Sequence, residues 1–160
     1  MFWDAIQPYV MWWAAGPLAQ WLGDSTSKVA WLFIFHLFGI TLMLGTRVLL
    51  SFRLLGLAFK DQPVSELSRQ LRPYAGTGLA LALLAGFLIF TGGADGYFTV
   101  PWFRTKMMLL AIALIFHFTL FRAVIRAEEN RFNPILNKVT GLLTLLLWFS
   151  VGVAGRWIAF

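Results

Sequence analysis

The sequence lacks cysteine and is poor in charged residues. Because none of its 160 residues is a cysteine, disulfides, thiolate metal sites and iron–sulfur clusters are excluded. Charged residues make up 12% of the chain and hydrophobic residues 59%, whereas a soluble domain carries roughly 25% charged residues. The composition therefore predicts an integral membrane protein, and the length suits one small membrane domain over 1–160.

Several kinds of catalytic site are missing as well. The sequence has no glycine-rich phosphate loop after a strand, no zinc-ligand spacing and no Ser–His–acid set within one compartment. Its acidic residues fall in connections or near the ends of apolar segments, which argues against a proton pathway built from membrane carboxylates. Any chemistry is therefore expected to be redox chemistry at a bound cofactor.

Four apolar segments are long enough to cross a membrane. A span of the hydrocarbon core requires about 20 mostly apolar residues. The stretches that meet this length are roughly 28–51, 74–93, 104–125 and 136–158. They predict an all-α fold, an integral membrane four-helix bundle with up-down-up-down topology.

Two segments outside these spans are also expected to be helical. Residues 1–24 are apolar but rich in tryptophan and broken by Gly16–Pro17, so we expect a retained, interfacial helical segment rather than a fifth span. Within 52–73, Pro63 is expected to open a short helix on the membrane surface, and Pro73 is expected to end it.

The distribution of positive charge predicts the orientation in the membrane. Nine of the 13 lysine and arginine residues flank the connections after the first and third spans, and four lie on the opposite side. Basic residues mark cytoplasmic connections. We therefore expect a multi-pass protein of a bacterial cytoplasmic (inner) membrane with both termini on the outer, periplasmic side.

The two histidines are the sharpest indication of function. His36 and His117 are the only histidines, and each lies within a different span. Imidazole in hydrocarbon is costly unless it is hydrogen-bonded, lines a cavity or binds a metal. The first and third spans run parallel and diagonal in such a bundle, at compatible depths, and Ile-Phe precedes both histidines. We therefore predict that both ligate the iron of one b-type haem.

Three further residues are predicted to bind this cofactor. Gly39 lies one turn from His36 and leaves room for the macrocycle. Arg47 and Lys106 share the faces of the two histidines at three turns' distance, and either cation could pair with a propionate.

Two alternatives remain open. Each histidine could instead form a hydrogen bond to a neighbouring helix, and the chain would then be a cofactor-free structural or accessory subunit of a membrane complex. Copper handling is the third possibility, because the thioether of Met43 and imidazole suit Cu(I). The sequence has no methionine-rich tract, so the indication for copper is weak.

Several blocks of sequence resemble a known family. They are HLFG at 36–39, FRLLGL at 52–57, LRPY at 71–74, AGFLIF at 85–90 and FRTKM at 103–107. They look like an uncharacterised bacterial family of four-helix membrane proteins, a domain of unknown function, over roughly residues 25–125. In more distant outline the chain is similar to copper-resistance D-type proteins and to four-helix b-type cytochromes. The cytochrome resemblance implies axial-ligand roles for His36 and His117.

These observations together predict an electron-transfer subunit rather than a stand-alone enzyme. We expect it to exchange electrons with a quinone or a partner protein, as a homo-oligomer or within a larger complex. Binding to nucleic acid is not expected, because the basic residues flank the spans rather than forming a patch.

Overall fold

The structure is helical throughout the residues that it describes. The computed structural model describes residues 2–126 and 134–158. The helices are α1 (Phe2–Ala14), α2 (Pro17–Gly23), α3 (Thr26–Leu55), α4 (Val64–Thr91), α5 (Ala94–Thr99), α6 (Pro101–Phe116), the π-helical turn η1 (His117–Phe121), α7 (Arg122–Arg126) and α8 (Pro134–Trp157). No strand occurs in the two described ranges. The all-α expectation is confirmed.

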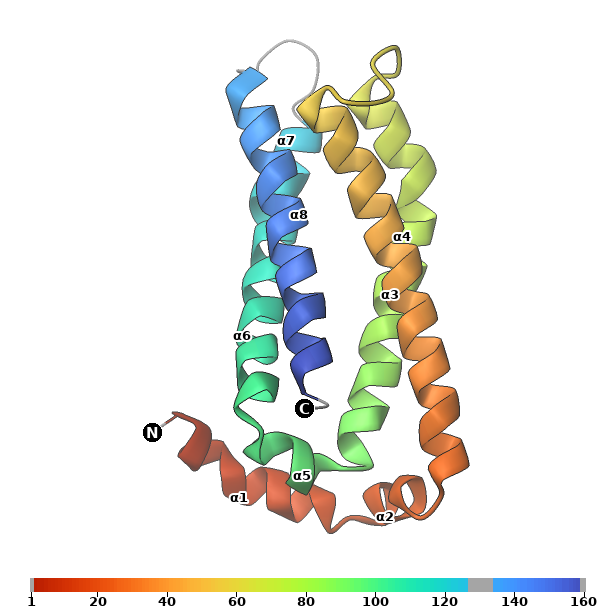
Figure 1. Cartoon of the computed structure of the whole chain (residues 1–160), viewed down its shortest axis with the longest axis vertical. Coiled ribbons are helices and arrows are strands. Elements are labelled where there is room, and N and C mark those ends of the chain that lie inside the picture. Colours follow the sequence, from red (N-terminus) through yellow and green to blue (C-terminus); the bar gives the residue numbers. More distant parts are fainter. Residues whose placement is uncertain (1, 127–133, 159–160) are drawn as a thin grey trace.

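Four long helical units form an up-down-up-down bundle (Figure 1). They are α3, α4, the continuous unit α6–η1–α7 and α8, and each is long and apolar enough to cross a membrane. α3 packs against α4 and α8, and α8 also packs against α6. α3 and α6 therefore lie on a diagonal and start from the same end of the bundle. The chain is a multi-pass membrane protein with four candidate spans.

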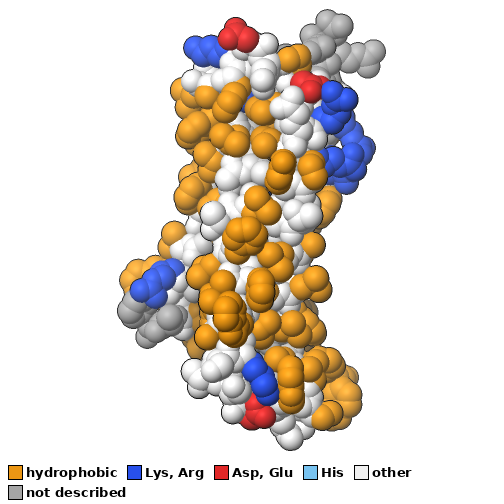
Figure 2. Space-filling model, turned by 90° about the vertical axis from the view of Figure 1, so that its right-hand side faces the viewer, with side chains coloured by type: hydrophobic (Ala, Val, Ile, Leu, Met, Phe, Trp, Pro, Cys, Tyr) orange, Lys and Arg blue, Asp and Glu red, His pale blue; other side chains and the backbone are white. Residues whose placement is uncertain are grey.

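The surface of the bundle agrees with this assignment. Figure 2 shows hydrophobic side chains along the length of the molecule, with charged side chains mostly near its two ends. Large apolar residues such as Phe38 on α3, Leu84 on α4 and Ile115 on α6 are 62%, 65% and 65% exposed. Such a surface is suited to lipid rather than to water.

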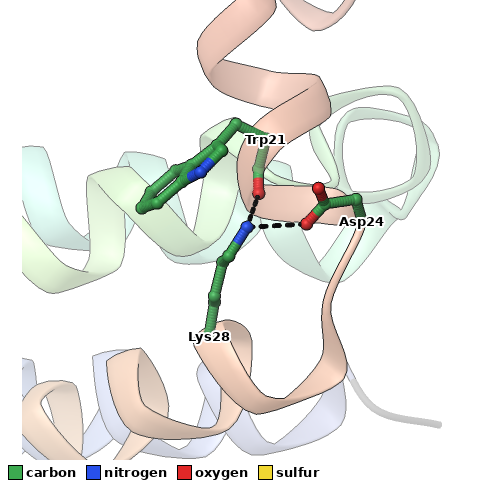
Figure 3. Close-up of polar contacts among 3 residues, drawn as sticks. All are labelled: Trp21, Asp24 and Lys28. Atoms are coloured by element: carbon green, nitrogen blue, oxygen red, sulfur yellow. Dashed lines mark hydrogen bonds and ion pairs between the residues drawn. The ribbon is translucent and has the colours of Figure 1, made fainter.

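The first two helices lie across one end of the bundle, which we call the α1/α2 end (Figure 1). Trp13 Nε1 donates a hydrogen bond to Thr91 Oγ1 at 3.2 Å, which fastens α1 to the end of α4. Lys28 Nζ donates to the Trp21 carbonyl and to Asp24 Oδ1, both at 2.7 Å, and lies 4.1 Å from the Trp21 ring centroid (Figure 3). The expected helical segment over 1–24 is therefore a helix pair, broken at Gly16–Pro17 as predicted.

The expectation of a separate surface helix before the second span is wrong. α4 begins at Val64 and continues through Pro73 without a break. Its first turns are held in line with the bundle because Val64 and Leu67 are buried in a cluster with Phe121 and Val124. Burial of this apolar face outweighs the local cost of one proline within the helix.

α3 and α4 cross with their backbones in close contact. A Cβ atom added to Gly39 would lie 2.6 Å from the backbone nitrogen of Ala82, and one added to Gly78 would lie 2.6 Å from that of Met43. Small residues allow membrane helices to approach in this way. Gly39, predicted to make room for a haem, instead contacts the backbone of α4.

Two apolar clusters form the core. One joins α3, α6 and α8 through Met43, Ala113, Trp148 and Val151. The other lies nearer the opposite end and contains Leu50, Leu54, Val64, Leu67, Phe121 and Val124. Buried polar residues lie between these clusters, and they form part of the site described next.

Candidate functional site

The parallel helices α3 and α6 pack with a fixed register. Met43 of α3 and Ala113 of α6 belong to one buried cluster, and they are 70 positions apart in the sequence. The hydrogen bond between Arg47 and His117 also joins residues separated by 70 positions. At this register, His36 is level with Lys106, and Arg47 is level with His117. The two levels are 11 residues apart on α3, or about 16 Å at 1.5 Å per residue.

His36 is held against α4 at the level nearer the α1/α2 end. Its ring is half-buried, and Nδ1 lies 2.7 Å from the carbonyl oxygen of Ala82. A carbonyl oxygen only accepts, so Nδ1 carries the proton and donates. Gly86 lies beneath the ring, because a Cβ there would be 2.8 Å from His36 Cε1. Nε2, which has no hydrogen-bond partner among the described residues, therefore keeps its lone pair available.

Lys106 occupies the corresponding level of α6. Its side chain lies along α8, where a Cβ added to Gly155 would be 3.3 Å from both Lys106 Nζ and Cε. The side chain is half-buried, and no salt bridge to an acidic residue is described for it. His36 and Lys106 thus bring one imidazole and one ammonium group to the same level of the bundle.

Arg47 and His117 meet at the second level. Arg47 is only 4% exposed, and its Nη2 lies 3.2 Å from His117 Nε2. A guanidinium can only donate, so Nε2 accepts and the proton of the neutral imidazole is on Nδ1. The guanidinium carbon also lies 5.3 Å from the Phe121 ring centroid. A buried arginine within a membrane span is costly and commonly marks a functional site.

The helix carrying His117 departs from α-helical geometry at this residue. The π-helical turn η1 runs from His117 to Phe121 and connects α6 to α7. Such turns occur frequently at functional sites, because the extra residue in the turn changes the direction of the side chains that follow it. The His117 ring lies with its centroid 5.2 Å from that of Phe121. No signal in the apolar sequence of this span indicated the turn.

The structure thus groups the predicted site residues into separate environments. Arg47 lies with His117, whereas His36 contacts Ala82 and Gly86 of α4. The register puts Lys106 rather than His117 at the level of His36. That both histidines ligate one iron stays a prediction, and in the described arrangement their rings face different neighbours.

The sequence analysis missed two buried hydroxyl groups near Arg47. Ser51 lies one turn further along α3, Thr140 lies on α8, and both side chains are 0% exposed. The helices meet here because a Cβ added to Gly141 would lie only 3.0 Å from the Ser51 carbonyl oxygen. Serine and threonine are common in membrane helices, so their sequence context gave no indication of this cluster.

Two further features bear on the choice of site. In the described ranges, no group of three or more histidine, cysteine or acidic side chains is placed to hold a metal ion. A groove of about 380 Å³ lies between α6 and α8, with Trp102, Leu109 and Phe149 among its lining residues. This groove is largely apolar, and neither His36 nor Arg47 is among its lining residues.

Comparison with known proteins identifies the family. The model of a family of unknown function, DUF6644, matches residues 10–160, and the chain therefore belongs to that family. No curated protein and no solved structure matches it. The expected membership of an uncharacterised family is confirmed, whereas similarity to b-type cytochromes or copper-resistance proteins is not shown.

Proposed function

We propose that this chain is a membrane electron-transfer protein that binds one b-type haem, with His36 as an axial ligand. The orientation of the His36 ring is the observation that supports this proposal most directly. Nδ1 donates to the Ala82 carbonyl, and such a second interaction fixes the tautomer and the direction of a metal-ligating imidazole. Nε2 is left as the ligand atom, so the donor set at His36 fits an axial position.

The other predicted residues take defined roles in this proposal. A bound haem would supply reversible one-electron transfer. Lys106, which the helix register puts level with His36, would pair with a propionate. Gly86 provides the space in which the His36 ring lies. The prediction from the sequence assigns the second axial position to His117. The helix register favours a version in which His117 remains with Arg47.

The electron partner and the membrane are part of the same proposal. Basic residues surround the connections at the end opposite α1 and α2, so this end is assigned to the cytoplasm of a bacterial inner membrane. Both termini would then be periplasmic. We propose a quinone or a partner protein as the electron partner, and a homo-oligomer or larger complex as the working form.

Visible spectra of two histidine variants test the proposal. His36→Ala should abolish or strongly alter the Soret band of the purified protein, because it removes the ligand atom. His117→Ala distinguishes the two ligation schemes: loss of the low-spin spectrum assigns His117 to the iron, and an unchanged spectrum leaves it with Arg47. If His36→Ala leaves the bound haem spectrum unchanged, the proposal is wrong.

A specific observation favours a second candidate, the cofactor-free accessory subunit. Both histidines already have interhelical hydrogen-bond partners, namely Ala82 and Arg47. In that case neither substitution has a spectral effect, and each costs only about 1 kcal/mol in unfolding free energy. Copper handling has less support, because Met43 is 4% exposed within an apolar cluster. Loss of stoichiometric copper in Met43→Leu would be its test.

A further inference from the structure

Buried polar side chains cross the bundle between its two apolar clusters. They are Thr46, Arg47 and Ser51 on α3, His117 at the start of η1, and Thr140 and Thr144 on α8. Of these, Arg47, Ser51, Thr140 and Thr144 are between 0% and 4% exposed. We call this group the polar layer. Its place between the two clusters separates it from the proposed haem ligand, His36, by about three helical turns.

Four atoms of the polar layer lack a described hydrogen-bond partner. They are Arg47 Nε, Ser51 Oγ, His117 Nδ1 and Thr140 Oγ1, all of them buried. The two nitrogen atoms are donors, because Arg47 cannot accept and His117 Nε2 is the acceptor in their mutual bond. The two hydroxyl groups can donate as well. Buried polar atoms without partners are rare and call for an explanation such as an unseen ligand.

Within the described ranges, the polar layer carries a positive charge that no acidic side chain compensates. Arg47 forms no ion pair with any acidic residue in the described part of the chain, and its contacts are His117 and the Phe121 ring. A cation at membrane depth normally has an anionic or acceptor partner. A neutral acceptor would satisfy the hydrogen-bond donors but would leave the positive charge of Arg47 without a counter-charge. A metal cation would be repelled by the guanidinium.

We propose that the polar layer binds an oxyanion, a carboxylate or a phosphate group. The negative charge of this ligand would offset the positive charge of Arg47. Its oxygen atoms would accept hydrogen bonds from Arg47 Nε and His117 Nδ1. Arg47 lies eight residues before the end of α3, about 12 Å along the helix. This depth is within reach of two sources, a free anion and the head group of an anionic lipid. The proposal does not depend on haem binding at His36.

Ligand-induced stabilisation of the full chain tests the proposal. The protein is purified in a neutral detergent and stripped of lipid. Its thermal unfolding midpoint is then measured against inorganic phosphate, acetate and phosphatidylglycerol, at constant ionic strength. Phosphatidylcholine, which has no net charge, is the lipid control. A ligand that binds only the folded state raises the midpoint in a concentration-dependent manner. Response to phosphate or acetate indicates a free anion, and response to phosphatidylglycerol alone indicates a lipid head group.

Matched variants locate the binding site. Arg47→Gln should weaken the binding at least tenfold, and Ser51→Ala should weaken it several-fold without changing the charge. Arg53→Gln removes the same charge from the same helix, outside the polar layer, and should leave the affinity unchanged. If Arg47→Gln does not fold, Arg47→Lys keeps the charge, loses the Nε donor and should still bind more weakly. The proposal is overturned if none of the three ligands stabilises the protein, or if the polar-layer variants bind as tightly as Arg53→Gln.

Discussion

At the scale of single residues, the neighbours of each histidine matter more than its position in a span. The residue types at 36, 47, 106 and 117 could be selected from the sequence because polar side chains in apolar spans are conspicuous. Which of these side chains lie together could not be predicted from the sequence. The Ile-Phe-His matches are 81 positions apart, whereas the helices pack with a register of 70. Register depends on side-chain packing between helices, which a short sequence match does not encode.

The fit between His36 and Gly86 provides a residue-scale prediction. Gly86→Ala places a Cβ 2.8 Å from His36 Cε1, so the ring must shift and its hydrogen bond to Ala82 weakens. We expect a loss of about 1 kcal/mol in unfolding free energy, partly offset by the better helix propensity of alanine. In a His36→Ala background the clash is absent, and Gly86→Ala should stabilise the helix by up to about 1 kcal/mol.

A double-mutant cycle on unfolding in mixed detergent micelles measures this coupling. Equal effects of Gly86→Ala in the two backgrounds would show that the His36 ring does not lie over Gly86.

At the scale of helices, the sequence predicts the length of each helix better than the places where a helix is broken or distorted. The four spans follow from apolar length, and the break at Gly16–Pro17 follows from helix-breaking residues. Pro73 has the same breaking tendency but lies inside α4, because neighbouring turns are buried against α7. Tertiary contacts decide this case, and local sequence does not report them. The π-helical turn at His117 likewise has no signal in the local sequence.

The crossing of α3 and α4 provides the prediction at this scale. Gly39→Ala would put a Cβ 2.6 Å from a backbone atom of α4, which cannot move away as a flexible side chain would. We expect a destabilisation of about 1–3 kcal/mol, as for other overpacked sites. Gly45→Ala on the same helix is the matched control, because a Cβ there meets nothing within 4 Å.

Reversible unfolding of the purified protein, followed by tryptophan fluorescence, compares these two variants. A Gly39→Ala protein as stable as Gly45→Ala would contradict the close helix crossing.

At the scale of the whole molecule, charge and aromatic residues define two different ends. α1 and α2 lie at one end of the bundle, and seven of the eight tryptophans belong to these two helices or lie near the ends of α3, α6 and α8 that adjoin them. The connections richest in lysine and arginine join the helices at the opposite end. This polarity predicts the orientation in the membrane. Alkaline phosphatase fused to the C-terminus should be active, because that enzyme requires the periplasm, and a fusion within 57–62 should be inactive.

The opposite pattern of reporter activity would reverse the orientation in the membrane. The polar layer, whose Arg47 lies nearer the Leu55 end of α3 than the Thr26 end, would then be in the periplasmic half. Four spans and the helix pair before them could be predicted because apolar length and helix breakers are local properties. The polar layer could not be predicted, because it assembles from three helices whose residues are unremarkable one by one.

The reduced-minus-oxidised visible spectrum of the purified protein, combined with a pyridine assay of haem per chain, tests the central claim most directly. The protein should be prepared from haem-replete cells and shown to be folded. The haem proposal predicts about one b haem per chain, with a sharp low-spin α band if His117 is the second ligand and broader, high-spin bands if His36 is the only histidine ligand. A folded preparation without colour would contradict it, and His36 would then be an interhelical hydrogen-bond donor alone.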